Sequence, residues 1–291
     1  MAFILLVSGL LPYDSGKTRF SISFIKRMKE RGIEFAPYKP VSAHSIYTQA
    51  WSFEESVRRG YLVGGDALLY EKELGLSEGS LLRMNPIDLL LSPLEPPNKP
   101  GPDKLKEYLK DMENQLKMTA LIRITGCESG DARYFLLEEN IENSPKSMKE
   151  KIIEFADRVG ARKVGLDEAF GELASSSVNK NLDRCLESIK DEKKNVLIES
   201  FSNSIYPYFS VLNKANALVI VAPGKAYLYN DTEPVREAIY SGKISTQYPE
   251  SHFLLSYVEP YAEEELLFGE PLAEGSPLLE LITRSISSSM L

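Results

Sequence analysis

An apolar run, a turn-rich loop and a Gly-Lys-Thr triplet at the start of the chain constrain its fold more than any other feature. Residues 2–7 (AFILLV) are continuously apolar, which is typical of a strand buried on both faces of a parallel sheet. Residues 8–15 (SGLLPYDS) are rich in turn formers, and residues 16–18 (GKT) follow directly. Apolar side chains then recur at helical spacing over residues 20–28, and Gly32 is placed to end a helix. The order of strand, loop, GKT and helix is the context of a phosphate-binding P-loop.

The residue types of this loop suit a triphosphate and a magnesium ion. Backbone N–H groups at a helix N-terminus stabilise phosphate oxygens, and Gly16 lets the backbone approach them without a Cβ clash. Lys17 is suited to bind the β and γ phosphates, and the Thr18 hydroxyl is suited to ligate Mg²⁺. The loop is two residues longer than in the standard GxxxxGK[ST] pattern, because the nearest upstream glycine is Gly9. The predicted phosphate-binding residues are Gly9, Tyr13, Asp14, Ser15, Gly16, Lys17 and Thr18.

Composition narrows the function classes. The 291 residues include 34 basic and 42 acidic side chains, and the acidic balance argues against a general nucleic-acid binder, which needs a basic face. Two cysteines, Cys127 and Cys185, exclude a disulfide scaffold and a four-cysteine zinc site. The N-terminal apolar run is too short for a membrane span and lacks the charged region of a signal peptide. We therefore expect a cytoplasmic protein without a membrane partner.

Several segments together resemble a known family. Within residues 7–42, the loop ending in GKT is followed by a helical pattern, a second strand and the turn 38–41 (YKPV). Later segments are 65–68 (GDAL), 85–97, which contains an Asn-Pro and a proline-rich stretch, and 196–199 (VLIE). These motifs resemble those of dethiobiotin synthetases and of the related cobyrinic acid amide synthetase group of P-loop proteins. Two further apolar segments, 217–222 (ALVIVA) and 253–260 (FLLSYVEP), are similar to later core strands of that family.

The resemblance implies a fold, two cofactors and a metal site. The expected fold is a three-layer, P-loop NTPase-like α/β domain with a mainly parallel sheet, and the expected cofactors are ATP and Mg²⁺. By the same resemblance, Asp66 and Glu199 join Thr18 as Mg²⁺ ligands, and the chain pairs as a homodimer with a small-molecule substrate near the interface. Where dethiobiotin synthetases carry a glycine-rich stretch after the acidic residue, this chain has residues 200–203 (SFSN).

Three of these side chains have alternative interpretations. Lys39 follows an apolar strand at the sheet edge where ligands bind, so its ammonium is a candidate for a γ-phosphate or carbamate; alternatively it is a solvated turn lysine. Glu199 ends an apolar strand and emerges at the same edge, where it contacts metal or water, or forms a structural ion pair. Asp66 approaches the metal from a helix start, or is an ordinary N-cap. The residues expected to act in catalysis are Lys17 and Lys39.

The rest of the chain adds elements to this core. Residues 101–116 are typical of a surface helix, and residues 118–137 of a β-hairpin with a long glycine-containing turn. A helical pattern follows through Met148 and closes at Gly160. We expect one domain over residues 1–291, with 118–178 as an inserted β-hairpin and helix subdomain. That insertion recognises a substrate or partner, or it enlarges a dimer interface.

Three further side chains have a less specific signal. His44 is a candidate general base near the γ-phosphate, although a lone histidine in a polar turn is usually solvated. His252 opens a predicted strand and has no chemical partner in sequence. Cys127 lies in the hairpin turn without an identifiable base, so no role is assigned to it.

The sequence therefore favours a Mg²⁺-dependent, ATP-binding enzyme. In this hypothesis the γ-phosphoryl group passes to a carboxylate or carbamate, and catalysis comes mainly from positioning and electrostatics. An alternative is a nucleotide-sensing regulatory ATPase module with slow hydrolysis and no ligase activity, which the SFSN segment favours. A small-molecule kinase without ring closure is a third possibility. The sequence does not name the substrate.

Overall fold

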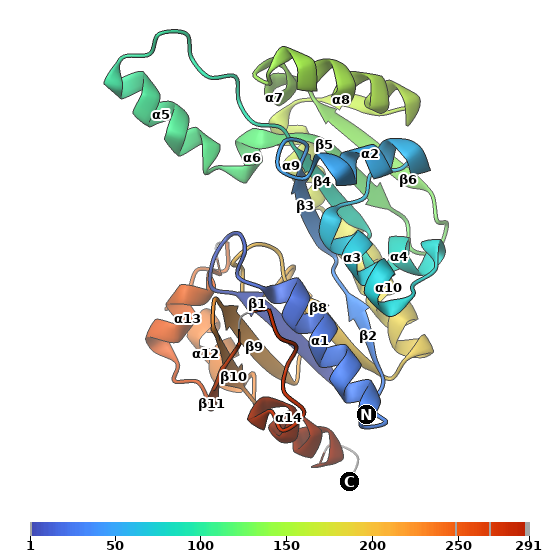
Figure 1. Cartoon of the computed structure of the whole chain (residues 1–291), viewed down its shortest axis with the longest axis vertical. Coiled ribbons are helices and arrows are strands. Elements are labelled where there is room, and N and C mark those ends of the chain that lie inside the picture. Colours follow the sequence, from blue (N-terminus) through green and yellow to red (C-terminus); the bar gives the residue numbers. More distant parts are fainter. Residues whose placement is uncertain (1, 248, 268, 289–291) are drawn as a thin grey trace. The chain divides into compact units, whose positions relative to one another are not determined.

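The chain divides into two compact α/β units, shown in Figure 1. This computed structural model describes residues 2–247, 249–267 and 269–288. Unit 1 comprises Met1–Pro40, Glu73–Gly75 and Asp183–Leu291, and unit 2 comprises Val41–Lys72 and Leu76–Leu182. Each unit contains its own sheet, so each is described by itself.

Unit 1 is built on a six-stranded sheet in the order β11-β10-β9-β1-β8-β2. Its four parallel strands are β1 (Ile4–Gly9), β2 (Phe35–Tyr38), β8 (Asn195–Glu199) and β9 (Ala217–Ala222). Two antiparallel strands, β10 (Lys225–Tyr229) and β11 (Ala262–Glu265), complete the sheet. Every residue of the four parallel strands is buried, which explains their continuous apolar sequences. The helices of unit 1 include α1 (Lys17–Glu30), α11 (Phe209–Leu212), α12 (Glu233–Tyr240), α13 (Ser251–Tyr257) and α14 (Pro277–Ser288).

Helix α1 packs against this sheet through one apolar face. Phe24 and Met28 are fully buried on that face, and the Phe24 ring meets the Phe35 ring of β2 edge-on at 5.2 Å between centroids. The helix ends in a turn where the Gly32 N–H donates to the Lys29 carbonyl at 3.0 Å. Gly32 has a φ of 76°, a value that glycine adopts without the strain of a side chain. The predicted order of strand, loop and helix is therefore confirmed.

Unit 2 is built on a five-stranded mixed sheet in the order β3-β4-β5-β6-β7. The strands are β3 (Val41–Ser45), β4 (Ile87–Leu91), β5 (Thr119–Thr125), β6 (Ala132–Leu137) and β7 (Arg162–Val164). Strands β3 and β4, and strands β6 and β7, are parallel, whereas β4, β5 and β6 pair antiparallel. Its helices include α2 (Ala50–Arg59), α4 (Glu78–Met84), α5 (Pro102–Met112), α6 (Gln115–Met118), α7 (Glu138–Glu142), α8 (Lys146–Arg158) and α9 (Leu166–Leu173). The division between the units falls inside α3 (Gly65–Leu74) and α10 (Ser176–Glu192).

The core of unit 2 joins its sheet to α2 and α8. Leu90, Leu121 and Leu136 from three neighbouring strands are buried in one cluster with Phe53 and Phe155 from these helices. The two rings meet edge-on, with centroids 5.7 Å apart. Burial of such side chains is the main stabilising contribution to a unit of this kind.

The structure confirms the α/β class and several predicted elements. Strands β5 and β6 form the predicted hairpin, with Leu121 opposite Leu136. Helix α8 occupies the region predicted to be helical around Met148, and α5 lies within the predicted surface helix. Residues 118–178 lie within unit 2, whose sheet also contains β3 and β4 from outside that segment. The single domain with an inserted subdomain remains a prediction.

The strand predicted over residues 253–260 is wrong. Residues Ser251–Tyr257 form helix α13, in which Ser251 and Leu254 are the buried positions. A spacing of three residues places both on one helical face, and the Ser251 hydroxyl donates to the Asn203 carbonyl at 3.0 Å. His252 therefore lies on a helix, half-exposed beside Glu250, and opens no strand. Tertiary burial decided between helix and strand for this short apolar run.

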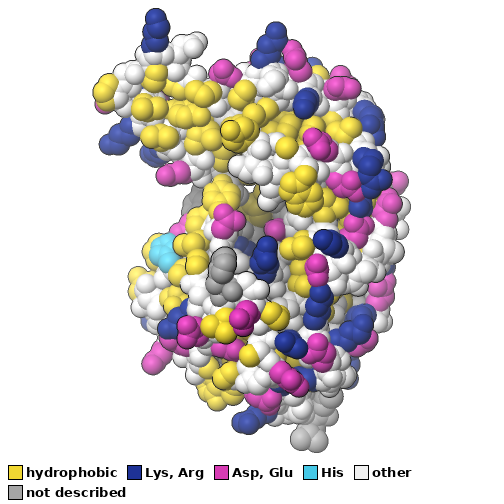
Figure 2. Space-filling model, in the orientation of Figure 1, with side chains coloured by type: hydrophobic (Ala, Val, Ile, Leu, Met, Phe, Trp, Pro, Cys, Tyr) yellow, Lys and Arg dark blue, Asp and Glu magenta, His cyan; other side chains and the backbone are white. Residues whose placement is uncertain are grey.

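Surface charge in the structure follows the mixed composition of the sequence. On the face drawn in Figure 2, acidic and basic side chains are interleaved, and no block of basic side chains gathers there among the described residues. No described helix has both the length and the apolar character that crossing a bilayer requires.

Candidate functional site

The carboxyl ends of β1 and β8 form the edge of unit 1 at which ligands of open parallel sheets bind. The two strands are adjacent and in register, with Val7 opposite Glu199. The chain leaving β1 continues to β2 beyond β8, whereas the chain leaving β8 continues to β9 beyond β1. The connections therefore run in opposite directions, which is the condition for a crevice at the strand ends.

The loop between β1 and α1 has the backbone of a strained, specific turn. Asp14 has a φ of 53° and Gly16 a φ of 89°, both in the left-handed region. Gly16 is the N-cap of α1, and its carbonyl accepts the Phe20 N–H at 3.0 Å. On the other side of the loop, the Leu10 N–H donates to the Val221 carbonyl of β9 at 2.9 Å. The loop is thus bonded to strand β9 at one end and continuous with the hydrogen bonds of helix α1 at the other.

Gly9 provides room for the side chain of Lys17. A Cβ atom at Gly9 would lie 2.3 Å from the Ser15 Oγ and 2.8 Å from the Lys17 Nζ, closer than real Cβ atoms come to their neighbours. The Lys17 ammonium therefore lies over Gly9, and Lys17 is 9% exposed. It donates to the Ser202 carbonyl at 2.7 Å and to the Ser15 hydroxyl at 3.3 Å.

One carboxylate oxygen accepts hydrogen bonds from two further predicted site residues. The Thr18 hydroxyl donates to the Glu199 Oε1 at 2.9 Å, and the Lys39 ammonium donates to the same oxygen. The Lys39 and Glu199 side chains are 4% and 1% exposed, so this ion pair is buried. Lys39 directly follows the apolar strand β2, as the sequence predicts, and its burial shows that it is not a solvated turn lysine.

The segment after β8 contributes residues that sequence reasoning missed. Ser202 has a φ of 53° and presents its carbonyl to Lys17, and its hydroxyl donates to the Pro12 carbonyl at 3.3 Å. The signal for it was available, because Ser202 lies where the resembling family has glycines, which adopt this conformation freely. The neighbouring Ser200 hydroxyl is buried and has no hydrogen-bond partner among the described residues.

Two predicted residues are exposed and one belongs to the other unit. Tyr13 and Asp14 are exposed at the tip of the loop. Asp66 lies in the first turn of α3 in unit 2, whereas Thr18 and Glu199 belong to unit 1. No group of three or more His, Cys, Asp or Glu side chains suited to a metal occurs in the described part of the chain. The metal role of Asp66 remains a prediction.

His44 is not the solvated residue of a polar turn that its neighbours in sequence indicate. It lies on β3 in unit 2, where Ser42 and His44 form the buried face of the strand. The His44 Nδ1 is 3.6 Å from the Asp88 Oδ2 of β4. Burial lowers the pKa of His44, an effect that the Asp88 carboxylate opposes and the Arg123 guanidinium reinforces. The prediction of a polar turn is wrong, and the alternation of buried and partly exposed residues along β3 explains the burial of His44.

Arg123 on β5 is the largest fully buried side chain of the described residues. Its guanidinium donates to the Leu62 carbonyl at 2.7 Å, to the Asn85 carbonyl at 2.8 Å and to the Thr125 hydroxyl. Burial lowers the pKa of Arg123, with the Asp88 carboxylate opposing the shift. These bonds to carbonyls of separate segments indicate a structural role in unit 2.

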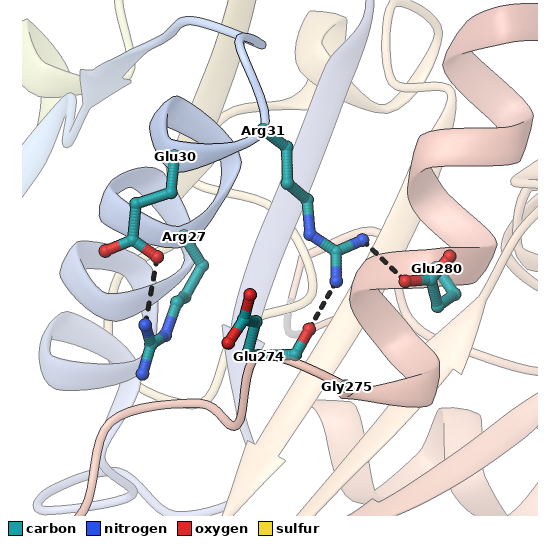
Figure 3. Close-up of a pocket in the computed structure, with 6 residues that line it drawn as sticks. All are labelled: Arg27, Glu30, Arg31, Glu274, Gly275 and Glu280. Atoms are coloured by element: carbon teal, nitrogen blue, oxygen red, sulfur yellow. Dashed lines mark hydrogen bonds and ion pairs between the residues drawn. The ribbon is translucent and has the colours of Figure 1, made fainter.

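A pocket on unit 1 lies at the opposite end of α1 from the GKT residues. It has a volume of about 380 Å³ and is lined by charged side chains (Figure 3). Arg27 pairs with Glu30 and Arg31 pairs with Glu280, each at 2.9 Å. Because these charges pair with one another, the pocket resembles a surface ion-pair network more than a ligand site.

Comparison with protein-family models, with curated proteins and with solved structures gave no match for this chain. The interpretation of the site therefore depends on the geometry of unit 1.

Proposed function

We propose that unit 1 binds ATP with Mg²⁺ at the loop between β1 and α1, and that the protein is an ATP-dependent enzyme activating a carboxylate or carbamate. One observation carries this proposal. The Thr18 hydroxyl and the Lys39 ammonium converge on one buried oxygen of Glu199, beside the Lys17 ammonium over Gly9. Buried charges cost stability unless they are paired, so an accumulation of two ammonium groups and a carboxylate at a sheet edge favours a functional role.

The loop and α1 fit a chain of phosphates. The N-terminus of α1 presents its first backbone N–H groups and the positive end of the helix dipole to the loop. Gly9 and Gly16 remove side chains from the two ends of the loop, and Lys17 adds an ammonium beside it. A phosphate oxygen would take the place of the Ser202 carbonyl as the acceptor for Lys17.

The oxygens of Thr18 and Glu199 fit magnesium. Mg²⁺ prefers oxygen ligands, and it is usually bound through one or two carboxylates together with substrate phosphates and water. Thr18 and Glu199 provide a hydroxyl and a carboxylate 2.9 Å apart.

The chain's own residues would act by charge and position. MgATP, when bound, supplies the phosphoryl group that is transferred. Lys17 and Lys39 lower the electrostatic cost of negative charge on that group, because both ammonium groups are buried and already oriented. Their burial also excludes water from around the group, which strengthens each electrostatic interaction. The resemblance supports an amine-dependent amide or ring closure as the following step.

A nucleotide-sensing ATPase is the second candidate. The observation that favours it is Ser202, whose carbonyl holds Lys17 where the resembling family has glycines. Such a segment holds the site in a resting state, which suits slow hydrolysis with a nucleotide-dependent change of oligomer. Turnover that rises with bicarbonate and a diamine supports the enzyme; slow basal hydrolysis that neither compound changes supports the sensor.

Binding of MgATP, measured by calorimetry, tests the proposal common to both candidates. Lys17→Met removes a charged hydrogen-bond donor worth about 1.5–3 kcal/mol, so the affinity should fall about 10- to 150-fold. Lys193→Met is the matched control, because Lys193 is half-exposed and pairs with Glu34 at 3.7 Å. These two residues precede β8 and β2, so they lie at the amino ends of the parallel strands, opposite the loop. Absence of MgATP binding by the wild-type protein would refute the proposal.

A further inference from the structure

A single buried carboxylate oxygen of Glu199 accepts two hydrogen bonds. Its Oε1 accepts from the Thr18 hydroxyl and from the Lys39 ammonium, and its side chain is 1% exposed. The proposed magnesium site uses the same oxygen and the same hydroxyl. Lys39 therefore occupies the part of the carboxylate that a divalent cation would need.

We infer that the Lys39 ammonium occupies the position of the divalent cation at Glu199 before nucleotide binds. Glu199 then exchanges this ammonium for the metal when nucleotide binds. This inference rests on the proposed function, since it concerns the same site. It assigns a regulation to that site: the metal is excluded from the Glu199 oxygen until the Lys39 ammonium moves from that oxygen to a phosphate.

The physical basis is the repulsion between two cations at one carboxylate. In a buried environment the interaction between charges is screened far less than in water, so an ammonium and a divalent cation cannot share Glu199 at low cost. A metal that arrives alone must displace the Lys39 ammonium from the Glu199 oxygen and so break this buried ion pair. Breaking a buried ion pair is strongly unfavourable.

A terminal phosphate removes this obstacle. Lys39 can transfer its hydrogen bond from Glu199 to a phosphate oxygen, because the flexible lysine side chain carries three donors on a mobile head. Glu199 is then available to the metal, with Thr18 as its neighbour. The protein should accordingly bind metal and nucleotide together, and bind the metal alone only weakly.

Binding of Mn²⁺ in the absence of nucleotide tests the inference. Mn²⁺ is a suitable probe because it accepts oxygen ligands as Mg²⁺ does and can be followed by electron paramagnetic resonance. Removing the ammonium in Lys39→Met should tighten Mn²⁺ binding at least about tenfold relative to wild type, well within the range of coupling between interacting sites. Lys39→Gln keeps a hydrogen-bond donor for Glu199 without the charge, and it should also tighten Mn²⁺ binding. This second variant keeps the test decisive if Lys39→Met does not fold.

Two controls assign the effect to Glu199. Lys193→Met removes a lysine from the same unit, at the opposite edge of the sheet, and should leave Mn²⁺ binding unchanged. Adding Glu199→Gln to Lys39→Met should abolish the gain, because the carboxylate that receives the metal is gone. A gain that survives Glu199→Gln would place the metal elsewhere and overturn the inference.

The outcomes separate this inference from the proposed function. If wild-type protein binds Mn²⁺ alone as tightly as Lys39→Met and Lys39→Gln do, Lys39 does not exclude the metal and the inference is wrong, even where MgATP binds. If wild-type protein binds no MgATP, the proposed function fails, whatever Mn²⁺ does alone.

Discussion

Replacing Lys39 by methionine should destabilise unit 1 by about 3–5 kcal/mol, the range for removing one partner of a buried ion pair. The loss of stability should reach this full range because the Lys39 and Glu199 side chains are 4% and 1% exposed. Solvent therefore does not screen the charge that remains on Glu199. The hydrogen bond from Thr18 stays in the variant, but a hydroxyl does not neutralise a carboxylate.

A double-mutant cycle separates the pair from its parts. Glu199→Gln keeps an acceptor for Thr18 but removes the carboxylate that pairs with the buried Lys39 ammonium, so it should also be destabilising. The double variant contains no buried charge at this position and should lose less stability than either single variant. The coupling energy between the two positions should therefore be several kcal/mol and favourable.

Hydrogen exchange of peptides from β1 and β8, followed over a denaturant series, is the appropriate assay. The single tryptophan, Trp51, lies in unit 2, so tryptophan fluorescence does not report on unit 1. Lys193→Met is the matched control, and loss of its exposed pair with Glu34 should cost about 0–1 kcal/mol. A cost below about 1 kcal/mol for Lys39→Met, or strictly additive single variants, would refute the reasoning.

Three further predictions concern single positions. The pKa of His44 in the folded state lies below its ordinary value. The stability of the protein should therefore be unaffected by this group above about pH 6.5 and should fall below that pH, by up to about 1.4 kcal/mol per pH unit, because the unfolded chain binds the proton more readily. His44→Gln should flatten this dependence in denaturation curves measured from pH 5 to 8. Gly9→Ala should reduce MgATP affinity more than stability, because its Cβ displaces the mobile ends of Ser15 and Lys17 rather than backbone; calorimetry with thermal denaturation distinguishes the two effects, and equal losses would contradict the prediction. Arg123→Met should cost about 3–5 kcal/mol in denaturant unfolding, because it leaves buried carbonyls without donors; near-wild-type stability would show that these bonds contribute little.

Elements whose pattern is local were predicted well. The continuous apolar run of β1, the helical spacing of α1 and the paired strands β5 and β6 each follow from the order of residues within one short segment. The prediction failed where an apolar run was short: the sequence of α13 fits a strand or a helix, and burial of only Ser251 and Leu254 selected the helix. The prediction for His44 failed for a related reason, because its polar neighbours in sequence are typical of a turn although they form a strand with one buried face.

By itself, the sequence determined the loop that ends in Gly16, Lys17 and Thr18 between a strand and a helix, because turn chemistry and periodicity act between near neighbours. It also indicated that Lys39 follows an apolar strand and that Glu199 ends one. Only the tertiary structure decided that these side chains meet. Glu199 lies 160 residues beyond Lys39 and 181 beyond Thr18, and the parallel pairing of β8 with β1 and β2 brings all three to one sheet edge. Strand order is set by long-range packing, so no local pattern specifies which side chains share that edge.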